Sequence, residues 1–278
     1  MIRISLVSQF SSSVSGVLFA GTVLLSLASS PASSQAAPVP YGDFSATTVD
    51  YLAVTEETLL TTSGKPDGLF GAPTVAGDSL DFDPIGFSAS STGGGPSDIL
   101  DVQLKFMIQA KDGNVIESIF LSEAGDTTLD NGFSSDDALS RVTANVFIDI
   151  LEVDGVGVGG ISVMGDMEFT PSDGDYQLSV DNPGGSSYNS GWSGKFFREF
   201  GPILADNGLT GKVTKISVAL DNTLTATSAS GSTAFIAKKD SDGVVITTNP
   251  DKNEVPEPTS LVLALGGLLA LAGARRRS

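Results

Sequence analysis

Hydrophobic and polar residues alternate with a period of two over long stretches of the chain. This period places alternate side chains on opposite faces of a β-strand, so each stretch predicts a strand with one buried face. The apolar positions of the three clearest stretches are Leu100, Val102, Leu104, Phe106, Ile108 and Ala110; then Val142, Ala144, Val146, Ile148 and Ile150; and then Ile216, Val218, Leu220, Leu224 and Ala226.

Turn-forming residues punctuate these strands. Asp112-Gly113-Asn114 predicts a hairpin whose second strand covers residues 115–121, and Asp154-Gly155 predicts another before residues 156–163. Further on, residues 233–237 and 244–248 predict a closing pair of strands around a turn at 238–243.

Helical periodicity is confined to one expected turn at residues 202–206. Two Gly/Ser-rich stretches, Ser88 to Ser97 and Asp181 to Gly194, are expected to be loops. Residues 41–60 supply only a strand or two, too few for a core of their own.

The fold class that follows is all-β, a single antiparallel β-sandwich of jelly-roll-like type covering residues 37–246. The absence of a fixed-period repeat argues against a solenoid or a propeller. Residues 247–254 form a polar spacer after this body.

The N-terminus has the features of a secretory signal peptide. Arg3 supplies a positive charge, residues 14–28 form an apolar segment, and Ser34-Gln35-Ala36 offers small residues at the positions that determine cleavage. Cleavage is predicted after Ala36, with Ala37 as the neighbouring alternative. Export implies the Sec machinery and signal peptidase as partners.

The C-terminus combines a short motif, an apolar run at residues 259–274 and a basic end. The run is somewhat shorter than the ~20 residues that usually span a bilayer, and it has no polar face, which argues against an amphipathic core helix. The arginines should stay on the cytoplasmic side. The motif and basic residues are Val255, Pro256, Glu257, Pro258, Arg275, Arg276 and Arg277.

This tripartite tail resembles the PEP-CTERM sorting signal, a tail that is sometimes also labelled an ice-binding protein C-terminal segment. The resemblance covers only residues 255–278. It implies recognition by an exosortase and a precursor held transiently in the inner membrane by a C-terminal transmembrane helix. The destination would be the cell surface or extracellular matrix of a Gram-negative-type bacterium.

The body between the two signals is strongly acidic. The chain has 15 basic and 33 acidic residues; without Arg3, the three terminal arginines and Glu257, the body keeps 11 basic against 32 acidic residues, a net charge of −21. Such a surface disfavours nucleic acid and anionic membranes, and it is compatible with divalent cations.

Cysteine and histidine are both absent. Disulfides, Ser-His-Asp and Cys-His catalysis and nearly all zinc or copper sites are thereby excluded. No catalytic residues are therefore predicted, and a carboxylate-dependent glycoside hydrolase is the remaining, less favoured enzymatic alternative.

Calcium is the only cofactor that the sequence suggests. Closely spaced carboxylates on tight turns suit a hard cation, but Asp-Gly pairs also serve as ordinary turn residues, and no EF-hand is complete. The candidate calcium ligands are Asp240, Asp242, Asp173 and Asp175, and a third group of carboxylates is formed by Asp78, Asp81 and Asp83.

Tyr188 and Trp192, in the second predicted loop, are candidate glycan contacts, because aromatic rings stack on sugars. The alternative is that both rings fold back onto the edge of the sandwich. The sequence therefore favours an exported, non-enzymatic structural or interaction protein. A carbohydrate- or calcium-binding adhesive module, with exopolysaccharide as partner, is the alternative.

Overall fold

The computed structural model describes residues 37–132 and 135–248, and side chains as far as Ser241. The signal peptide with its cleavage residue Ala36, the sorting signal and most of the polar spacer lie outside this part. Within the described ranges, no helix has the length and hydrophobicity needed to cross a membrane.

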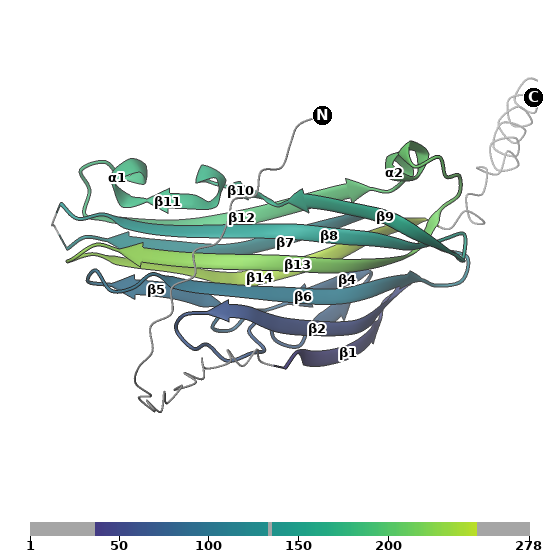
Figure 1. The fold of residues 1–278 in the computed structure, drawn as a ribbon, viewed down its shortest axis with the longest axis horizontal. Helices are drawn as coiled ribbons and strands as arrows, with labels where there is room; N and C mark the ends of the chain where they lie inside the picture. Colours follow the sequence, from purple (N-terminus) through teal and green to yellow (C-terminus); the bar gives the residue numbers. More distant parts are fainter. Residues whose placement is uncertain (1–36, 133–134, 249–278) are drawn as a thin grey trace, which may run out of the picture. The chain divides into compact units, whose positions relative to one another are not determined.

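The described body is almost entirely antiparallel β-sheet, arranged as a nearly closed, barrel-like sandwich (Figure 1). The strands are β1 Val39–Ser45, β2 Val49–Thr61, β3 Thr74–Ala76, β4 Ser79–Phe82, β5 Ser88–Thr92, β6 Asp98–Ala110, β7 Val115–Asp130, β8 Ala138–Val153, β9 Val156–Asp166, β10 Glu168–Thr170, β11 Asp175–Gln177, β12 Ser187–Glu199, β13 Val213–Ser228 and β14 Thr233–Thr248. Short helices are α1 Leu178–Asp181, α2 Gly201–Asp206 and a 3₁₀ turn at Ser172–Gly174.

Two layers make up the sandwich. The first has the order β1-β2-β6-β13-β8, and both β9 and β11 pair with the outer edge of β8. The second has β7 between β12 and β14, with β4 and β5 on the other side of β14. A single pairing of Val213 with Ile116 joins β13 to β7 and brings the two layers together along one side.

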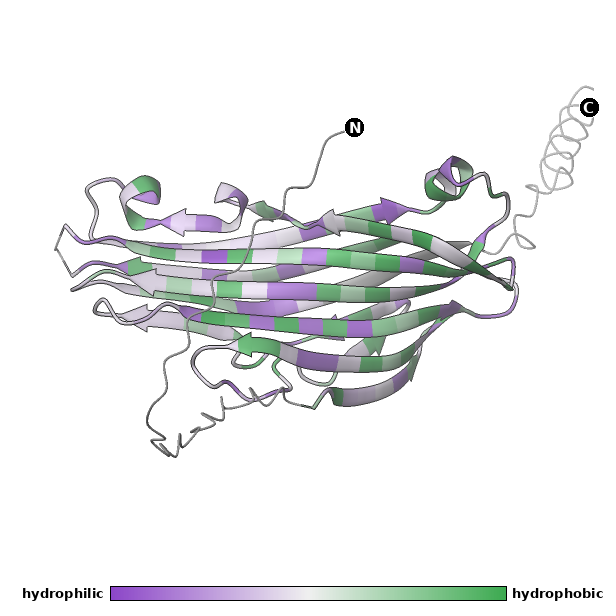
Figure 2. Ribbon diagram, in the orientation of Figure 1, coloured by the Kyte–Doolittle hydropathy of each residue, from purple (hydrophilic) through white to green (hydrophobic). Residues whose placement is uncertain are grey.

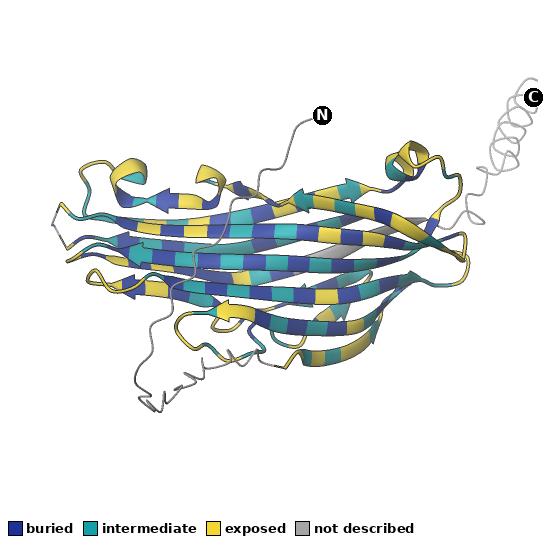
Figure 3. Ribbon diagram, viewed as in Figure 1, coloured by how far each residue is buried: buried dark blue, intermediate teal, exposed yellow. Residues whose placement is uncertain are grey.

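The core lies between these layers, and the alternating sequence pattern explains it. Green and purple bands alternate along the strands in Figure 2, and buried and more exposed residues alternate in Figure 3. All but one of the apolar positions predicted to face inward on β6, β8 and β13 are buried; the exception is Ala110, which is half-buried and packs against the core. The predicted fold class, an all-β antiparallel sandwich, is therefore confirmed. The jelly-roll-like connectivity stays a prediction.

The predicted hairpin across Asp112-Gly113-Asn114 is wrong. β6 pairs with β2 and β13, whereas β7 pairs with β12 and β14, so the connection crosses from one layer to the other. A tight turn and two alternating strands fit either arrangement, because the inward faces of both strands still meet in the core. The hairpin at Asp154-Gly155 is confirmed as β8–β9.

The end of the body also differs from the prediction. Residues 233–248 form one strand, β14, and the expected turn at 238–243 does not exist. A register shift between Lys238 and Asp240 lets the strand continue past these polar residues. Lys238 turns inward and is buried. The expected helical turn is confirmed as α2.

Both predicted loops contain strands. Ser88–Thr92 forms β5 and pairs with β14, while residues 187–194 form the first half of β12 and pair with β7. Small residues suit these positions where space is limited: a Cβ on Gly194 would lie 2.5 Å from the Phe169 ring. Gly and Ser therefore mark close approach here rather than a loop.

A buried carboxylate fixes the segment between β2 and β3. Glu56 is fully buried; its Oε1 accepts from the Leu69 amide (2.6 Å), and its Oε2 accepts from the Phe70 amide (2.9 Å) and the Tyr41 hydroxyl (2.6 Å). These bonds satisfy a group that would be costly to bury alone. They hold the Phe70 ring over the centre of the core, where it packs edge-on against Phe82 and Phe87.

Candidate functional site

A groove of about 630 Å³ opens beside the end of β8 that pairs with β11. Its volume falls in the range of small-molecule sites, roughly 300–1,000 Å³. Strands β8 and β13 contribute one wall, and the segment from the 3₁₀ turn to α1 contributes the other. The lining residues that carry polar groups into it include Arg141, Asp173, Gln177, Asp181, Thr225 and Thr227.

Hydrogen bonds hold in place the groove wall that residues 172–181 form. The Asp181 carboxylate accepts hydrogen bonds from the Ser172 hydroxyl (2.9 Å) and from the backbone amide of Gln177 (2.7 Å). Ser172 and Asp173 both have left-handed backbone angles, with φ of 57° and 51°. Such angles are uncommon for residues other than glycine and persist only where the surroundings enforce them.

Asp137 anchors the other end of the same segment. Its carboxylate accepts from the Gln177 side chain (2.5 Å) and from both the amide (3.1 Å) and the hydroxyl (2.7 Å) of Ser179. Burial alone would raise the pKa of Asp137, but these hydrogen bonds outweigh it and lower the pKa. The lowered pKa favours the ionised form of Asp137, and its negative charge anchors this end of the wall.

Arg141 and Asp175 form a two-pronged ion pair at the groove. Arg141 Nε lies 2.6 Å from Asp175 Oδ1, and Arg141 Nη2 donates to Oδ2 at 2.8 Å. Both side chains are more than half exposed, so the pair adds little stability. It places a fixed planar cation at the groove surface.

This pairing bears on the predicted calcium ligands Asp173 and Asp175. Asp175 is engaged by Arg141, whose positive charge opposes a cation at the same carboxylate. Among the described residues, the only group of three or more acids close enough to share an ion lies elsewhere. The two residues line one groove but do not form a shared metal cluster.

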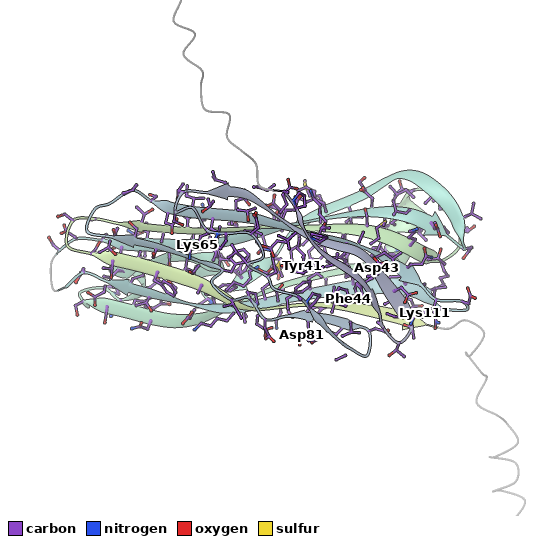
Figure 4. All side chains as sticks on the ribbon, turned by 90° about the horizontal axis from the view of Figure 1, so that it is seen from below. Tyr41, Asp43, Phe44, Lys65, Asp81 and Lys111 are labelled. Carbon is purple, nitrogen blue, oxygen red and sulfur yellow. The ribbon has the colours of Figure 1, made fainter. Side chains whose placement is uncertain are left out.

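The acids that do lie close enough to share an ion are Asp81, Asp83 and Asp240. Their carboxylate oxygens all lie within 4.8 Å of one another. The pairing of β4 with β14 brings them together, although Asp240 lies 157 residues after Asp83 in the sequence; Asp81 is labelled in Figure 4. Asp240 was predicted as a ligand with Asp242, whose side chain lies outside those described. Asp78, nearby in sequence, instead accepts from the amide and hydroxyl of Thr48, both at 2.6 Å.

The predicted aromatic platform is wrong for Trp192. Its side chain is 3 % exposed and packs edge-on against Phe169, with ring centres 5.8 Å apart. Tyr188 is half-buried and stacks on Tyr176, whose own hydroxyl is buried without a hydrogen-bond partner among the described residues. Burial raises the pKa of Tyr176. The rings fold back onto the sandwich, as in the alternative interpretation.

A carboxylate pair also occurs on the outer face of the first layer. Asp101 of β6 and Asp221 of β13 lie on neighbouring strands. Burial, and then the hydrogen bond and negative charge of Asp221, raise the pKa of Asp101 from 3.8 to about 6. Two like charges this close favour sharing one proton.

Comparisons with known proteins identify no family. No family model matches the chain, and no curated protein matches it either. One solved structure with some likeness is the tailspike protein 4 enzymatically active domain of bacteriophage CBA120, at 10% identity and a TM-score of 0.19. The alignment covers 75% of this chain and 19% of that chain, and at this TM-score it carries no argument about function.

Sequence reasoning missed Arg141, Gln177 and Asp181, although all three lie close to the acids that it selected. Arg141 occupies an outward position of a regular strand, where a charged residue is ordinary. Gln177 and Asp181 acquire their roles only when the segment folds against β8.

The Asp101–Asp221 pair predicts a specific pH dependence. Because the folded pKa of Asp101 is raised, its contribution to stability is complete below about pH 4 and is lost as the pH rises through about 6. Asp101→Asn cannot ionise, so its melting temperature at pH 7 should exceed that of the wild type by roughly 1–3 °C. The difference should vanish at pH 4.

Melting curves of both proteins between pH 4 and pH 7 check this prediction. Asp112→Asn, at an exposed turn, serves as the matched control and should follow the wild type at every pH. Identical behaviour of both variants would refute the shared-proton interpretation.

Proposed function

We propose that this chain is an exported, non-enzymatic protein of the cell surface or extracellular matrix, whose sandwich binds a neutral exopolysaccharide. The observation that carries the proposal is the groove beside β8. Its wall presents the guanidinium of Arg141, the amide of Gln177, the carboxylates of Asp173 and Asp181, and the hydroxyls of Thr225 and Thr227. Donors and acceptors of this kind suit a ligand with many hydroxyl groups.

Export rests on the two terminal signals in the sequence, and the surface chemistry is compatible with it. A body with a net charge of −21 stays soluble in a crowded matrix but repels anionic polymers. A neutral glycan avoids this repulsion. Exosortase processing of the tail would release the body from the inner membrane once it has crossed.

Non-enzymatic action is part of the proposal. The chain lacks histidine and cysteine, which removes the usual nucleophile and base pairs. The Asp101–Asp221 carboxylates lie on the face of a sheet and do not line the groove. A glycosidase needs its two carboxylates on either side of a bound sugar.

Calcium binding is the second candidate, and the clustering of Asp81, Asp83 and Asp240 favours it. Three carboxylates can supply part of the six to eight oxygen ligands that Ca²⁺ takes, and water can supply the rest. Such a site would fasten β4 to β14 and make this edge of the sandwich responsive to calcium.

Glycan binding is tested by retention of the full chain on beads that carry a neutral exopolysaccharide. Arg141→Gln should weaken retention about tenfold, since a hydrogen bond from a charged group contributes roughly 1.5–3 kcal/mol. Lys239→Gln removes the same charge from an exposed position on β14, outside the groove, and should bind like the wild type. Equal loss in both variants, or no saturable retention at all, would contradict the proposal.

Calcium binding is tested by thermal melts with calcium and with a chelator. A ligand present at about 100 times its dissociation constant adds about 2.7 kcal/mol, which raises the melting temperature by roughly 5–10 °C in a body of this size. Asp83→Asn should abolish most of the rise, whereas Asp206→Asn, at the end of α2, should keep it. A wild-type melt that ignores calcium would refute the site.

A further inference from the structure

Three polar side chains meet in the middle of the hydrophobic core. Lys238 projects inward from β14, Glu123 from β7 and Asn222 from β13. All three are almost completely inaccessible to solvent, at 1 %, 3 % and 0 % exposed. Lys238 and Glu123 lie in one layer and Asn222 in the other, so the group bridges the sandwich.

Lys238 is at the centre of this group. Its Nζ donates to Glu123 Oε1 in a very short ion pair and lies 2.5 Å from Asn222 Oδ1. The rings of Phe70 and Phe87 face the same nitrogen, with their centres at 5.1 and 5.0 Å. The amine is thus enclosed by a carboxylate, a carboxamide and two aromatic faces, and its side chain is inaccessible to solvent.

The hydrogen bonds within this group leave two of its buried polar atoms unpaired. Asn222 Nδ2 and Glu123 Oε2 are buried, and neither has a hydrogen-bond partner in the described part of the chain. Leaving such groups unpaired in a hydrophobic core is unfavourable. A purely structural network would use these atoms, whereas a reacting group needs one free carboxylate oxygen and a departing nitrogen.

The distances suit bond formation. The Asn222 carboxamide carbon is one bond of about 1.2 Å from the oxygen that Nζ approaches. Nζ is therefore no more than about 3.7 Å from that carbon, near the ~3–3.5 Å of a reactive arrangement. A neighbouring carboxylate within hydrogen-bond reach can carry the protons that such a step must move.

We propose that Lys238 and Asn222 form an intramolecular isopeptide bond between the two layers, with Glu123 transferring the protons. Glu123 takes a proton from the Lys238 ammonium, and the neutral amine attacks Asn222 Cγ. The Nζ–Cγ bond forms, and the Cγ–Nδ2 bond breaks. Glu123 delivers this proton to the departing nitrogen, which leaves as ammonia, and then accepts the second proton from Nζ, so that Nζ becomes a neutral amide. The released ammonia carries that proton away as ammonium, which restores the Glu123 carboxylate, and the reaction needs no oxidant, metal or cofactor.

Burial assists the first step. Desolvation lowers the pKa of Lys238 to about 8, although the attraction of Glu123 opposes this shift. A neutral amine is the nucleophilic form of lysine. The same burial excludes water, which would otherwise compete for the carboxamide carbon.

The product would connect β13 to β14 covalently through the core. The two strands are consecutive in sequence but belong to opposite layers. An exported protein without cysteine would thereby gain a cross-link that reducing agents cannot break.

Peptide mapping of the full chain, purified from the producing cell, tests the proposal. Trypsin should yield a peptide from Ile216 to Lys239 that is uncut at Lys238 and lighter by one ammonia, about 17 Da. Chymotryptic cleavage between residues 222 and 238 should leave two fragments joined to each other. Cleavage at Lys238 would overturn the proposal, even with the same mass loss, because a succinimide at Asn222 alone leaves Lys238 free.

Three variants separate the reaction from mere proximity. Glu123→Gln keeps the shape of the side chain but removes its proton transfer, and the linked fraction should fall at least tenfold. Asn222→Asp should still link, now with loss of water, and give a product of the same mass as the wild-type product. Lys239→Arg, at the exposed neighbouring position, should link fully. Absence of the link from both the wild type and Asn222→Asp would show that the group is an unreacted buried ion pair.

Discussion

The buried contact between Lys238 and Glu123 is the constraint on which the sandwich depends. A charge removed from water must be paired, and leaving either partner alone in the core would cost several kcal/mol. The two side chains come from neighbouring strands of one layer, and Asn222 reaches them from the other. The pair therefore fixes the register of β14 against β7 and the position of β13 across the core.

The elements around this contact serve to enclose it. Glu56 holds the segment that carries Phe70, and Phe70 covers Lys238 on one side while Phe87 covers it on another. The regular alternation along β14 turns Lys238 inward with Ala234 and Ile236, while Lys239 remains exposed. The groove, by contrast, is built at the edge of the sandwich, where the segment before β12 folds against β8. The proposed binding surface and the proposed cross-link are therefore separate parts of the molecule.

Sequence alone predicted the long strands β6, β8 and β13 and their buried faces, because a period of two directly reports which side chains face a core. It missed β5 and the first half of β12, whose Gly- and Ser-rich sequences are typical of loops. It could not predict which strands are neighbours. Asp112-Gly113-Asn114 suits a hairpin and a crossing between layers equally well, and only long-range packing decides between them. Lys238 was placed in a turn because it begins the polar stretch at residues 238–243, and its partner Glu123 is distant in sequence. Asp240 was predicted to lie in one acidic group and Asp81 and Asp83 in another, whereas the pairing of β4 with β14 brings all three together through a register that the sequence does not show.

The central claim, that a bond between Lys238 and Asn222 joins the two layers, is tested most directly by a crystal structure of the body at atomic resolution. The account predicts continuous electron density from Nζ to Cγ, with a planar amide and a C–N length of about 1.33 Å. No density for Nδ2 should remain on Asn222. Two separate side chains at ordinary hydrogen-bond distance, with Nδ2 present, would contradict it.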